Sequence, residues 1–368
     1  MADQLELIQT PDYKQIQQNF LQELNLASQN KPSSISFLKN HLPTKPLLAN
    51  GIVQGIVIGG TNYILATAVI NSNGTHKIIA KKTGVLPVFD TKKTFVDFLT
   101  EHLTPDVDAI GINFGFPLEA ITGSFGELDG KLLLGTKEHT FKGLINEPLG
   151  QLIKTLYQKK CHKMPMVSVA NDTVCLTLAG DGTEKGSLVA GTGFNMCLVT
   201  KYQHKKTLIN LESGNFNKFT LTPILQKIDD TSEDPGKQLL EKATSGKYLA
   251  LYFNEKIKEL HLPLSPIKTS QQLSELSHEN HHDVAGDLAR AIITRSAYLV
   301  AAAIAGLYEY SSKPQTFTLI GEGSLLWNGW QYHENIQKQL TKLGVPRNAI
   351  VIKHIPDSSI KGAIGLII

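Results

Sequence analysis

The chain has 368 residues, a length that favours two domains with substantial cores. Its 36 Lys and Arg residues against 33 Asp and Glu residues give a net charge of +3, too small to predict nucleic acid or an anionic membrane as a partner. Apolar residues make up 41% of the chain, a share that is ordinary for a globular protein and excludes disorder of the whole chain. The three cysteines have no CxxC spacing, so no disulfide framework is predicted and a reducing compartment fits better.

Targeting and membrane-spanning features are not predicted. The N-terminal residues lack the apolar stretch of a secretory signal. The most continuous apolar segment, residues 297–308, is shorter than the roughly 20 residues that a membrane span needs. We therefore expect a cytoplasmic protein.

The first part of the chain predicts one helix followed by strands. Residues 1–30 place apolar side chains at helical spacing, which predicts an amphipathic helix, and one helical turn is expected around 37–42. The β-branched sequence 53–70 is interrupted by a Gly-Gly-Thr-Asn turn, which predicts two strands joined at Gly59–Asn62. The next expected elements are a strand, a helix and a buried strand, over 76–83, 94–103 and 108–114.

The second part of the chain repeats this arrangement. Asn146 is expected to cap a helix with Pro148 in its first turn. A buried strand over 167–170 is followed by a second hairpin over 187–199. Helices are expected over most of 235–309, and strands over 317–320 and 349–355. Because strand hairpins with glycine turns occur in both halves, we predict two similar α/β units with a boundary near 170.

Two glycine turns are candidate phosphate loops. The turns at 59–62 and 191–195 expose backbone N–H groups without side chains in the way, which suits an anionic phosphate. Each alone is better explained as an ordinary hairpin turn, and the turn at 59–62 lacks the GxGxxG spacing of a dinucleotide site. Two such loops in one chain could together hold successive phosphates of one nucleotide.

Candidate catalytic residues occur in two further motifs. Asp172 follows a buried strand, where ligands of α/β folds gather, and could accept a proton from a substrate hydroxyl. The alternative is that Asp172 or Thr173 caps the next helix. Lys137 could balance the charge of a transferred phosphoryl group, and the alternative is an exposed surface lysine. The histidines at 278–282 lack zinc spacing and indicate a solvated loop.

Taken in order, these segments resemble the hexokinase family of sugar kinases, within the actin-like ATPase superfamily. The resemblance runs nearly from end to end and depends on the number and common order of short motifs. These motifs are SSISFLKNHLP at 33–43, GGTN at 59–62, NFGFP at 113–117, GTK at 135–137, SVANDTV at 168–174, GTGFN at 191–195, NLESGNF at 210–216, DPGKQLLEKATSGKYL at 234–249, IGEGSL at 320–325 and DSSIKGA at 357–363.

The resemblance implies an α/β fold with two actin-like, ribonuclease H-like lobes and a cleft between them. Residues 1–50 would be a helix and connector packed on the large lobe, 51–170 the small lobe, and 171–368 the large lobe. The implied reaction is phosphorylation of glucose or a similar hexose at its 6-hydroxyl, with ATP as donor and Mg²⁺. Hexose and ATP are the expected partners, and no nucleic acid, membrane or oligomeric state is predicted.

The family's site residues carry over to matching positions of this sequence. Asp172 would be the general base and Lys137 would help to orient the attacking oxygen. A ring of hydroxyls is well held by acids and amides, which accept and donate hydrogen bonds in pairs. The implied sugar ligands are Thr136, Lys137, Asn171, Asp172, Asn195, Glu212, Gln238 and Glu241. The implied nucleotide-binding residues are Gly59, Gly60, Thr61, Asn62, Gly191, Thr192, Gly193, Lys247, Gly321, Gly323, Ser324 and Ser359.

The sequence also departs from the family pattern, and no metal ligand is assigned. Val57 stands where the family has an Asp that helps to hold Mg²⁺ through water, and Ile64 stands where an Arg is common. Ile360 and Gly135 replace a Gly and a Trp. Because phosphoryl transfer depends on charge neutralisation, the departures leave a second hypothesis open: a weak or inactive relative that binds sugar as a sensor or regulator. A kinase for a different sugar or amino sugar is a third.

Overall fold

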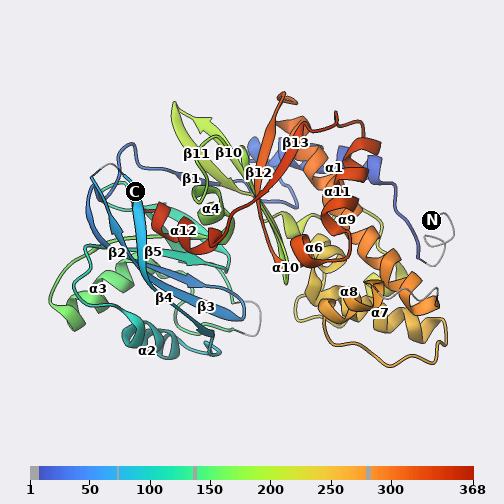
Figure 1. Ribbon diagram of the computed structural model, residues 1–368, viewed down its shortest axis with the longest axis horizontal. Helices are drawn as coiled ribbons and strands as arrows, with labels where there is room; N and C mark the ends of the chain where they lie inside the picture. Colours follow the sequence, from blue (N-terminus) through green and yellow to red (C-terminus); the bar gives the residue numbers. More distant parts are fainter. Residues whose placement is uncertain (1–7, 73, 136–138, 279–282) are drawn as a thin grey trace. The chain divides into compact units, whose positions relative to one another are not determined.

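The computed structural model describes residues 8–72, 74–135, 139–278 and 283–368 (Figure 1). The chain divides into two compact units, and neither is continuous in sequence. Unit 1 comprises Met1–Phe37, Leu188–Met196 and Leu211–His354, and unit 2 comprises Leu38–Ser187, Cys197–Asn210 and Ile355–Ile368.

Unit 2 is built on a five-stranded sheet with the strand order β4-β3-β2-β5-β8. Its strands are β2 (Gly51–Ile58), β3 (Asn62–Ile70), β4 (His76–Val85), β5 (Ala109–Phe114) and β8 (Met166–Asn171). β2, β5 and β8 are parallel neighbours, and their register pairs Ile58 with Phe114 and Phe114 with Asn171. The turn after β2, the loop after β5 and Asp172 after β8 therefore leave the same edge of the sheet, where α/β folds bind their ligands.

Helices cover both faces of this sheet (Figure 1). α2 (Lys92–His102) and α3 (Leu149–Cys161) lie on one face, and α12 (Ser358–Gly365) lies on the other against β2 and β5. The core under α2 and α3 is a cluster of buried aromatic and aliphatic side chains that includes Phe95, Phe114 and Phe141. A short β-ribbon, β6 (Leu118–Thr122) with β7 (Leu128–Leu132), and the helix α4 (Asp172–Leu178) complete the described secondary structure around the five-stranded sheet.

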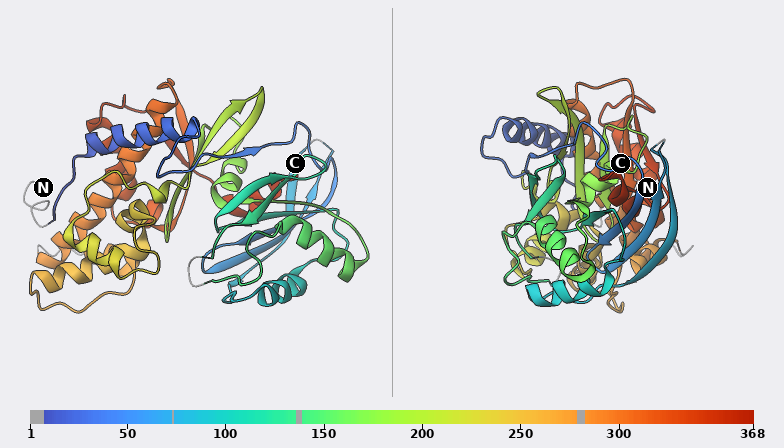
Figure 2. Two further views of the ribbon diagram at one scale, coloured as in Figure 1. Left: turned by 180° about the vertical axis from the view of Figure 1, so that it is seen from behind. Right: turned by 90° about the vertical axis from the view of Figure 1, so that its left-hand side faces the viewer.

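Unit 1 is mainly helical around one long buried helix, α9 (Val284–Tyr310). α1 (Tyr13–Ser28) runs along α9 although their sequences are far apart (Figure 2). The other helices of the unit are α5 (Pro223–Asp230), α6 (Leu239–Thr244), α7 (Gly246–Glu259), α8 (Ser270–His278), α10 (Ser324–Asn328) and α11 (Tyr332–Lys342), with the 3₁₀ turn η2 (Ser213–Asn215).

The apolar segment at 297–308 is part of α9, a 27-residue helix that extends beyond this segment at both ends. By length and composition alone, α9 is the one helix among the described residues that could cross a membrane. Since 94% of its most apolar window is buried inside the fold, α9 has the environment of a core helix.

A second sheet has six strands in the order β1-β11-β10-β9-β12-β13. These are β1 (Leu38–His41), β9 (Gly186–Ala190), β10 (Phe194–Tyr202), β11 (Lys205–Asn210), β12 (Phe317–Glu322) and β13 (Ile350–His354). The helical turn expected around 37–42 is therefore wrong. β1 pairs antiparallel with β11, and the Asn40 amide donates to the Leu208 carbonyl at 3.2 Å. Pairing with this distant strand overrides the weak local helical preference.

The expected cap at Asn146 is also wrong. α3 begins at Leu149, and the N-cap residue is Pro148, which makes no side-chain cap hydrogen bond. The carboxylate of Asp129, the second residue of β7, accepts a hydrogen bond from the Gly150 N–H at 2.6 Å instead. A negative charge at this position satisfies an otherwise unpaired amide and interacts favourably with the positive end of the helix dipole.

Candidate functional site

In unit 1, the turn at 191–193 is the point where several glycine loops meet. The Gly191 N–H donates to the Gly193 carbonyl at 3.0 Å, and the Gly246 N–H donates to the Gly191 carbonyl at 2.7 Å. A Cβ atom on Gly323, whose φ is +123°, would lie 2.1 Å from the Ala190 carbonyl oxygen. Only glycine permits this backbone contact and this φ.

Two other residues predicted to bind the nucleotide lie next to these glycines in the chain. Lys247 is exposed in the first turn of α7, directly after Gly246, and Ser324 begins α10 directly after Gly323. Backbone amides of glycine turns and first helical turns attract anions. Gly321, by contrast, is enclosed in β12, where a Cβ atom would lie 2.6 Å from Ile352, so close packing requires glycine there.

Two predicted sugar ligands, Asn195 and Glu212, are held next to each other in unit 1. The Asn195 Oδ1 atom accepts hydrogen bonds from the Ser213 backbone N–H at 3.0 Å and from the Ser213 hydroxyl at 3.2 Å. Glu212 precedes Ser213 and has a left-handed backbone with φ of +45°. Left-handed backbone in a residue other than glycine is uncommon and concentrates at functional sites.

The other two predicted ligands of unit 1 reach the same loops from α6. The Glu241 carboxylate accepts a hydrogen bond from the Phe194 N–H at 2.9 Å, beside Asn195. Gln238 precedes α6 with φ of +52°, and its N–H donates to the Asn215 side chain at 3.3 Å. Since the Asn215 N–H donates to the Glu212 carbonyl at 3.0 Å, Asn215 connects the two left-handed residues. All four predicted ligands of unit 1 are thus brought together.

A buried ion cluster holds the segment before Gln238. The Lys242 side chain is completely buried and donates to the Asp229 carboxylate at 2.7 Å and to the Asp234 carbonyl at 2.8 Å. Asp229 also accepts the Gly236 N–H at 2.9 Å. Sequence reasoning missed both Asn215 and Lys242, although both lie inside the matched motifs, because their partners are visible only in the fold.

In unit 2, Asn171 and Asp172 lie at the end of β8 and the start of α4. The Asn171 Oδ1 accepts the Thr173 N–H at 3.1 Å, so Asn171 is the helix cap. The Asp172 carboxylate also accepts the Thr173 N–H, at 2.7 Å, and its side chain is half-buried. α4 packs closely against α12: a Cβ atom on Gly362 of α12 would lie 2.0 Å from the carbonyl oxygen of Cys175 in α4. The cap role thus belongs mainly to Asn171.

The remaining predicted residues of unit 2 are placed as follows. The Gly59 N–H donates to the Asn62 carbonyl at 3.1 Å and closes the tight turn between β2 and β3. Ser359 lies in the first turn of α12, and its carbonyl accepts from the Asn113 amide at 3.2 Å. Thr136 and Lys137 lie outside the described residues.

Three departures from the family pattern form one apolar cluster. Val57 and Ile64 are directly paired across β2 and β3. Val57 packs with Ala66, Ile360 and Ala363, and Ile64 packs against the same cluster. An apolar surface offers no oxygen ligand, so this position does not fit a metal-orienting group. Among the described residues, no group of three or more His, Cys, Asp or Glu side chains could hold a metal ion.

Burial sets the protonation of two groups beside the candidate residues. Burial, and then the charge of Glu241, raises the pKa of Tyr248 well above its usual value, so this phenol remains a neutral donor. Burial raises the pKa of the Cys197 thiol to about 12, with Asp172 adding to the shift, which makes this thiol inert at neutral pH.

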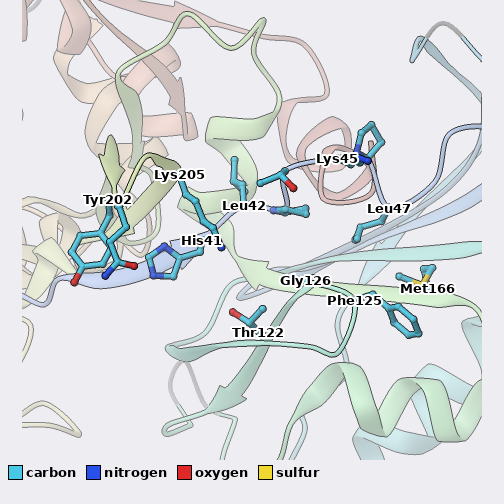
Figure 3. Close-up of a pocket in the computed structure, with 14 residues that line it drawn as sticks. His41, Leu42, Lys45, Leu47, Thr122, Phe125, Gly126, Met166, Tyr202 and Lys205 are labelled. Carbon is cyan, nitrogen blue, oxygen red and sulfur yellow. The ribbon is translucent and has the colours of Figure 1, made fainter.

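A pocket of about 540 Å³ occurs elsewhere in unit 2 (Figure 3). It is lined by residues 41–47, by the β6–β7 turn, by the tip of the β10–β11 hairpin and by Met166. Met166 begins β8 and Asn171 ends it, so the pocket and Asp172 lie at opposite ends of a strand that spans roughly 17 Å. None of the predicted site residues that the structure describes lines this pocket.

Comparisons of sequence and of structure with known proteins both find hexokinases. A family model described as Hexokinase matches residues 185–262 and 254–367. A hexokinase of Schistosoma mansoni is 24% identical over 96% of this chain and 92% of its own length. Hexokinase-2 of Solanum tuberosum is 24% identical over 89% of this chain and 81% of its own. The solved structure of the Schistosoma mansoni hexokinase complexed with glucose superposes with a TM-score of 0.80 at 21% identity, covering 99% of this chain and 97% of that one. The fold is therefore that of the hexokinase structures.

Proposed function

Because the chain belongs to the hexokinase family, we propose that it is a hexose kinase that transfers a phosphoryl group from ATP to the 6-hydroxyl of glucose or a similar hexose. The observation that carries this proposal is the convergence of Asn195, Glu212, Gln238 and Glu241 in unit 1. Two carboxylates and two amides suit a polyol, because they accept and donate the hydrogen bonds that ring hydroxyls offer.

In the proposed reaction, Asp172 accepts the proton of the 6-hydroxyl while that oxygen attacks the γ-phosphorus of ATP. The bond from the γ-phosphorus to the bridging oxygen breaks, and ADP leaves with the bond electrons. Asp172 suits the role of base because it follows a buried strand at the ligand-binding edge of its sheet and because Asn171 caps α4. Lys137 would balance charge on the transferred group.

Mg²⁺ would enter this reaction as part of the MgATP substrate. The phosphate oxygens of ATP are ligands that Mg²⁺ prefers, and they can hold the ion without a dedicated protein cage. Val57 on β2 lies in an apolar cluster, so β2 offers no carboxylate at this position that could orient the ion.

The proposal is tested by measuring ADP formation with ATP and a panel of hexoses, and by locating the phosphate on the product by ³¹P NMR. We expect glucose or a close relative to give the 6-phosphate. Asp172→Asn should lower kcat by about 10²–10⁴, the usual effect of losing a general base, while the sugar still binds. Near-normal turnover of this variant would remove Asp172 from the mechanism, and phosphate on another oxygen would refute the stated position of transfer.

The apolar cluster around Val57 favours a second candidate, a sugar-binding sensor or regulator with little or no catalysis. The same assay separates the two candidates. Tight glucose binding measured by calorimetry, together with no ADP formation at any Mg²⁺ concentration, would support the sensor and exclude the kinase.

A further inference from the structure

We propose that the pocket of about 540 Å³ in unit 2 is a second ligand site, which binds a small organic phosphate with its phosphate group at one end and an apolar group at the other. This inference does not depend on the proposed kinase activity, because none of the predicted site residues that the structure describes lines the pocket. The volume lies within the range of roughly 300–1,000 Å³ that is typical of small-molecule pockets.

The walls of the pocket are held in place by backbone hydrogen bonds. The Leu42 N–H donates to a carbonyl of β11 at 3.2 Å, and the Leu47 N–H donates to a carbonyl after α12 at 2.9 Å, so the segment 41–47 is fixed near both ends. The Gly126 N–H donates to the Gly123 carbonyl at 3.1 Å and closes the β6–β7 turn. Because these walls are already ordered, little conformational entropy is lost when a ligand binds between them.

Positive charge gathers at the end of the pocket that the β10–β11 hairpin forms. Figure 3 shows His41, Tyr202 and Lys205 together at this end. The His41 ring stacks on Tyr202 with a centroid distance of 5.6 Å, and its Nδ1 atom is hydrogen-bonded to the Thr207 hydroxyl at 3.0 Å, which holds the ring in one orientation. The Lys39 ammonium lies 4.2 Å from the centroid of the Tyr202 ring and adds a second lysine charge at this end. Lysine ammonium groups are common ligands of phosphate.

The residues that line the pocket include no carboxylate to offset this charge. None of the 14 lining residues is Asp or Glu. Two carboxylates on adjoining residues are bonded to lysines outside the lining. Glu127 in the β6–β7 turn is paired with Lys154, and its side chain is 1% exposed. Asp108, whose carbonyl accepts the Met166 N–H, is paired with Lys163 at 3.0 Å. The charge of the lining therefore favours an anion.

The other end of the pocket is apolar. Leu47, Phe125 and Met166 line it there, apart from Tyr202 in Figure 3. Phe125 is 73% exposed in the β6–β7 turn, and the apolar part of a ligand would cover an aromatic face that now contacts water. Inorganic phosphate would leave this end of the pocket unused. The occupant that suits both ends is an organic phosphate with an aromatic or other apolar group.

Calorimetry with 1-naphthyl phosphate as the probe tests the proposal on the whole protein. This probe combines an aromatic group with a phosphate, and we expect it to bind more tightly than 1-naphthol or inorganic phosphate, each of which occupies one end only. Its affinity should fall as salt is added, because salt screens the lysine charges. Saturating glucose, or the substitution Lys247→Met in the predicted nucleotide site, should leave its affinity unchanged. Loss of binding in either case would place the probe at the candidate active site and overturn the proposal.

Two substitutions in the pocket, each with a matched control, locate the probe. Lys205→Met should weaken binding of 1-naphthyl phosphate about tenfold, the effect of losing one hydrogen bond to a charged group, and Lys159→Met, at an exposed lysine of α3, should not. Phe125→Ser should weaken binding about threefold or more through lost apolar contact, and Val85→Ser, at a side chain of β4 that is 76% exposed, should not. All of these side chains are exposed, so the variants should fold, and thermal unfolding verifies this.

A further substitution covers the case in which one of these variants fails to fold. Lys45→Met removes the other lysine of the lining and should also weaken binding of the probe. Wild-type affinity in the Lys45, Lys205 and Phe125 variants would overturn the proposal. So would the absence of binding at millimolar 1-naphthyl phosphate, or an equal affinity for 1-naphthol or inorganic phosphate. Because these measurements need no hexose phosphorylation, an inactive wild type would refute the proposed function and leave the second site to be decided by binding.

Discussion

The carboxylate of Glu241 accepts the backbone N–H of Phe194 at 2.9 Å, and the space between this carboxylate and the turn at 191–193 is too small for a methyl group. A Cβ atom on Gly193 would lie 2.7 Å from the Glu241 Oε2 atom. A predicted sugar ligand is thus in contact with a predicted phosphate loop. Their contact means that a change in the loop is transmitted to the sugar ligand.

We predict that Gly193→Ala weakens hexose binding with little effect on folding. The new methyl group meets the end of a flexible side chain rather than backbone, so the Glu241 carboxylate can move aside at small cost in stability. Its displacement should raise KM for the hexose about tenfold or more. The measurement is steady-state kinetics with hexose as the varied substrate, together with thermal unfolding.

A double-mutant cycle provides the control for this prediction. If Gly193→Ala acts through Glu241, then adding it to Glu241→Ala should cause no further rise in KM for the hexose. Additive effects of the two substitutions would show that the turn at 191–193 acts on the sugar independently of Glu241.

A second prediction concerns the apolar cluster of β2, β3 and α12. Val57→Asp alone should destabilise the protein, because it buries a carboxylate without a partner beside Ile64 and Ile360. Ile64 is directly opposite residue 57 in the antiparallel register, so adding Ile64→Arg supplies an opposite charge and should recover part of the loss. Thermal unfolding of both variants measures the effect.

Magnesium dependence gives this prediction a second measurement. In the double variant, the restored carboxylate should lower the Mg²⁺ concentration needed for half-maximal activity. Val57→Asp with wild-type stability would show that water reaches this position and that the cluster does not enclose it. The same Mg²⁺ requirement in all three proteins would show that no carboxylate at position 57 assists the metal.

Local features of the fold were predictable from sequence, and features that depend on distant pairing were not. The β2–β3 hairpin was predictable because β-branched residues and a Gly-Gly turn lie next to one another in the chain. β1 was not, since its partner β11 is about 170 residues away and its own sequence carries a helical pattern. The prediction of Asn146 as the cap of α3 was wrong for a similar reason. The side chain that accepts a hydrogen bond from the first turn of α3 is Asp129, which comes from β7.

In the candidate site, too, contacts between residues far apart in the sequence could not be predicted. Candidate residues for it could be proposed from the sequence because the motifs keep their order along the chain. The contact between Val57 and Ile360 was not predictable, because about 300 residues separate β2 from α12. The structure changes the interpretation of these departures. Val57, Ile64 and Ile360 pack in one apolar cluster, so single substitutions there should not act independently.

A third prediction concerns the buried cluster before Gln238. Lys242→Met should destabilise the protein by about 3–5 kcal/mol, because it leaves Asp229, whose side chain is 5% exposed, buried without its cation. The measurement is denaturant unfolding. Hexose KM should also rise, since Asp229 and Lys242 together hold the segment that leads to Gln238.

The exposed pair Lys93–Asp97 is the matched control for Lys242. Lys93→Met removes a lysine from an ion pair of the same type, but its side chains are 82% and 60% exposed and solvent screens the interaction. Unfolding of this variant should match the wild type. A Lys242→Met protein as stable as Lys93→Met would show that the buried charge cluster contributes nothing to the fold.

The final prediction is a pH dependence of stability at Glu23. Glu23 is buried on α1, where its carboxylate accepts the Ser34 hydroxyl at 2.7 Å and the Ser33 hydroxyl at 3.1 Å. Burial raises the pKa of this carboxyl, but the bonds from the Ser34 backbone N–H and from the two hydroxyls outweigh burial and lower the pKa below its usual value. The bonds therefore stabilise the folded protein above the unfolded pKa, and this stability is lost as pH falls through the folded pKa.

Glu23→Gln should lower Tm by a few degrees at neutral pH, because hydrogen bonds to a charged acceptor contribute about 1.5–3 kcal/mol. The difference in Tm from the wild type should shrink as the pH falls below the ordinary pKa of a glutamate, since the wild-type carboxyl is then protonated as well. Glu101→Gln, an exposed change on α2, should give no difference at either pH. A Glu23→Gln difference that is constant from neutral pH to acid would show that packing, not the ionised carboxylate, accounts for the loss, because only an ionised group makes the stability depend on pH in this range.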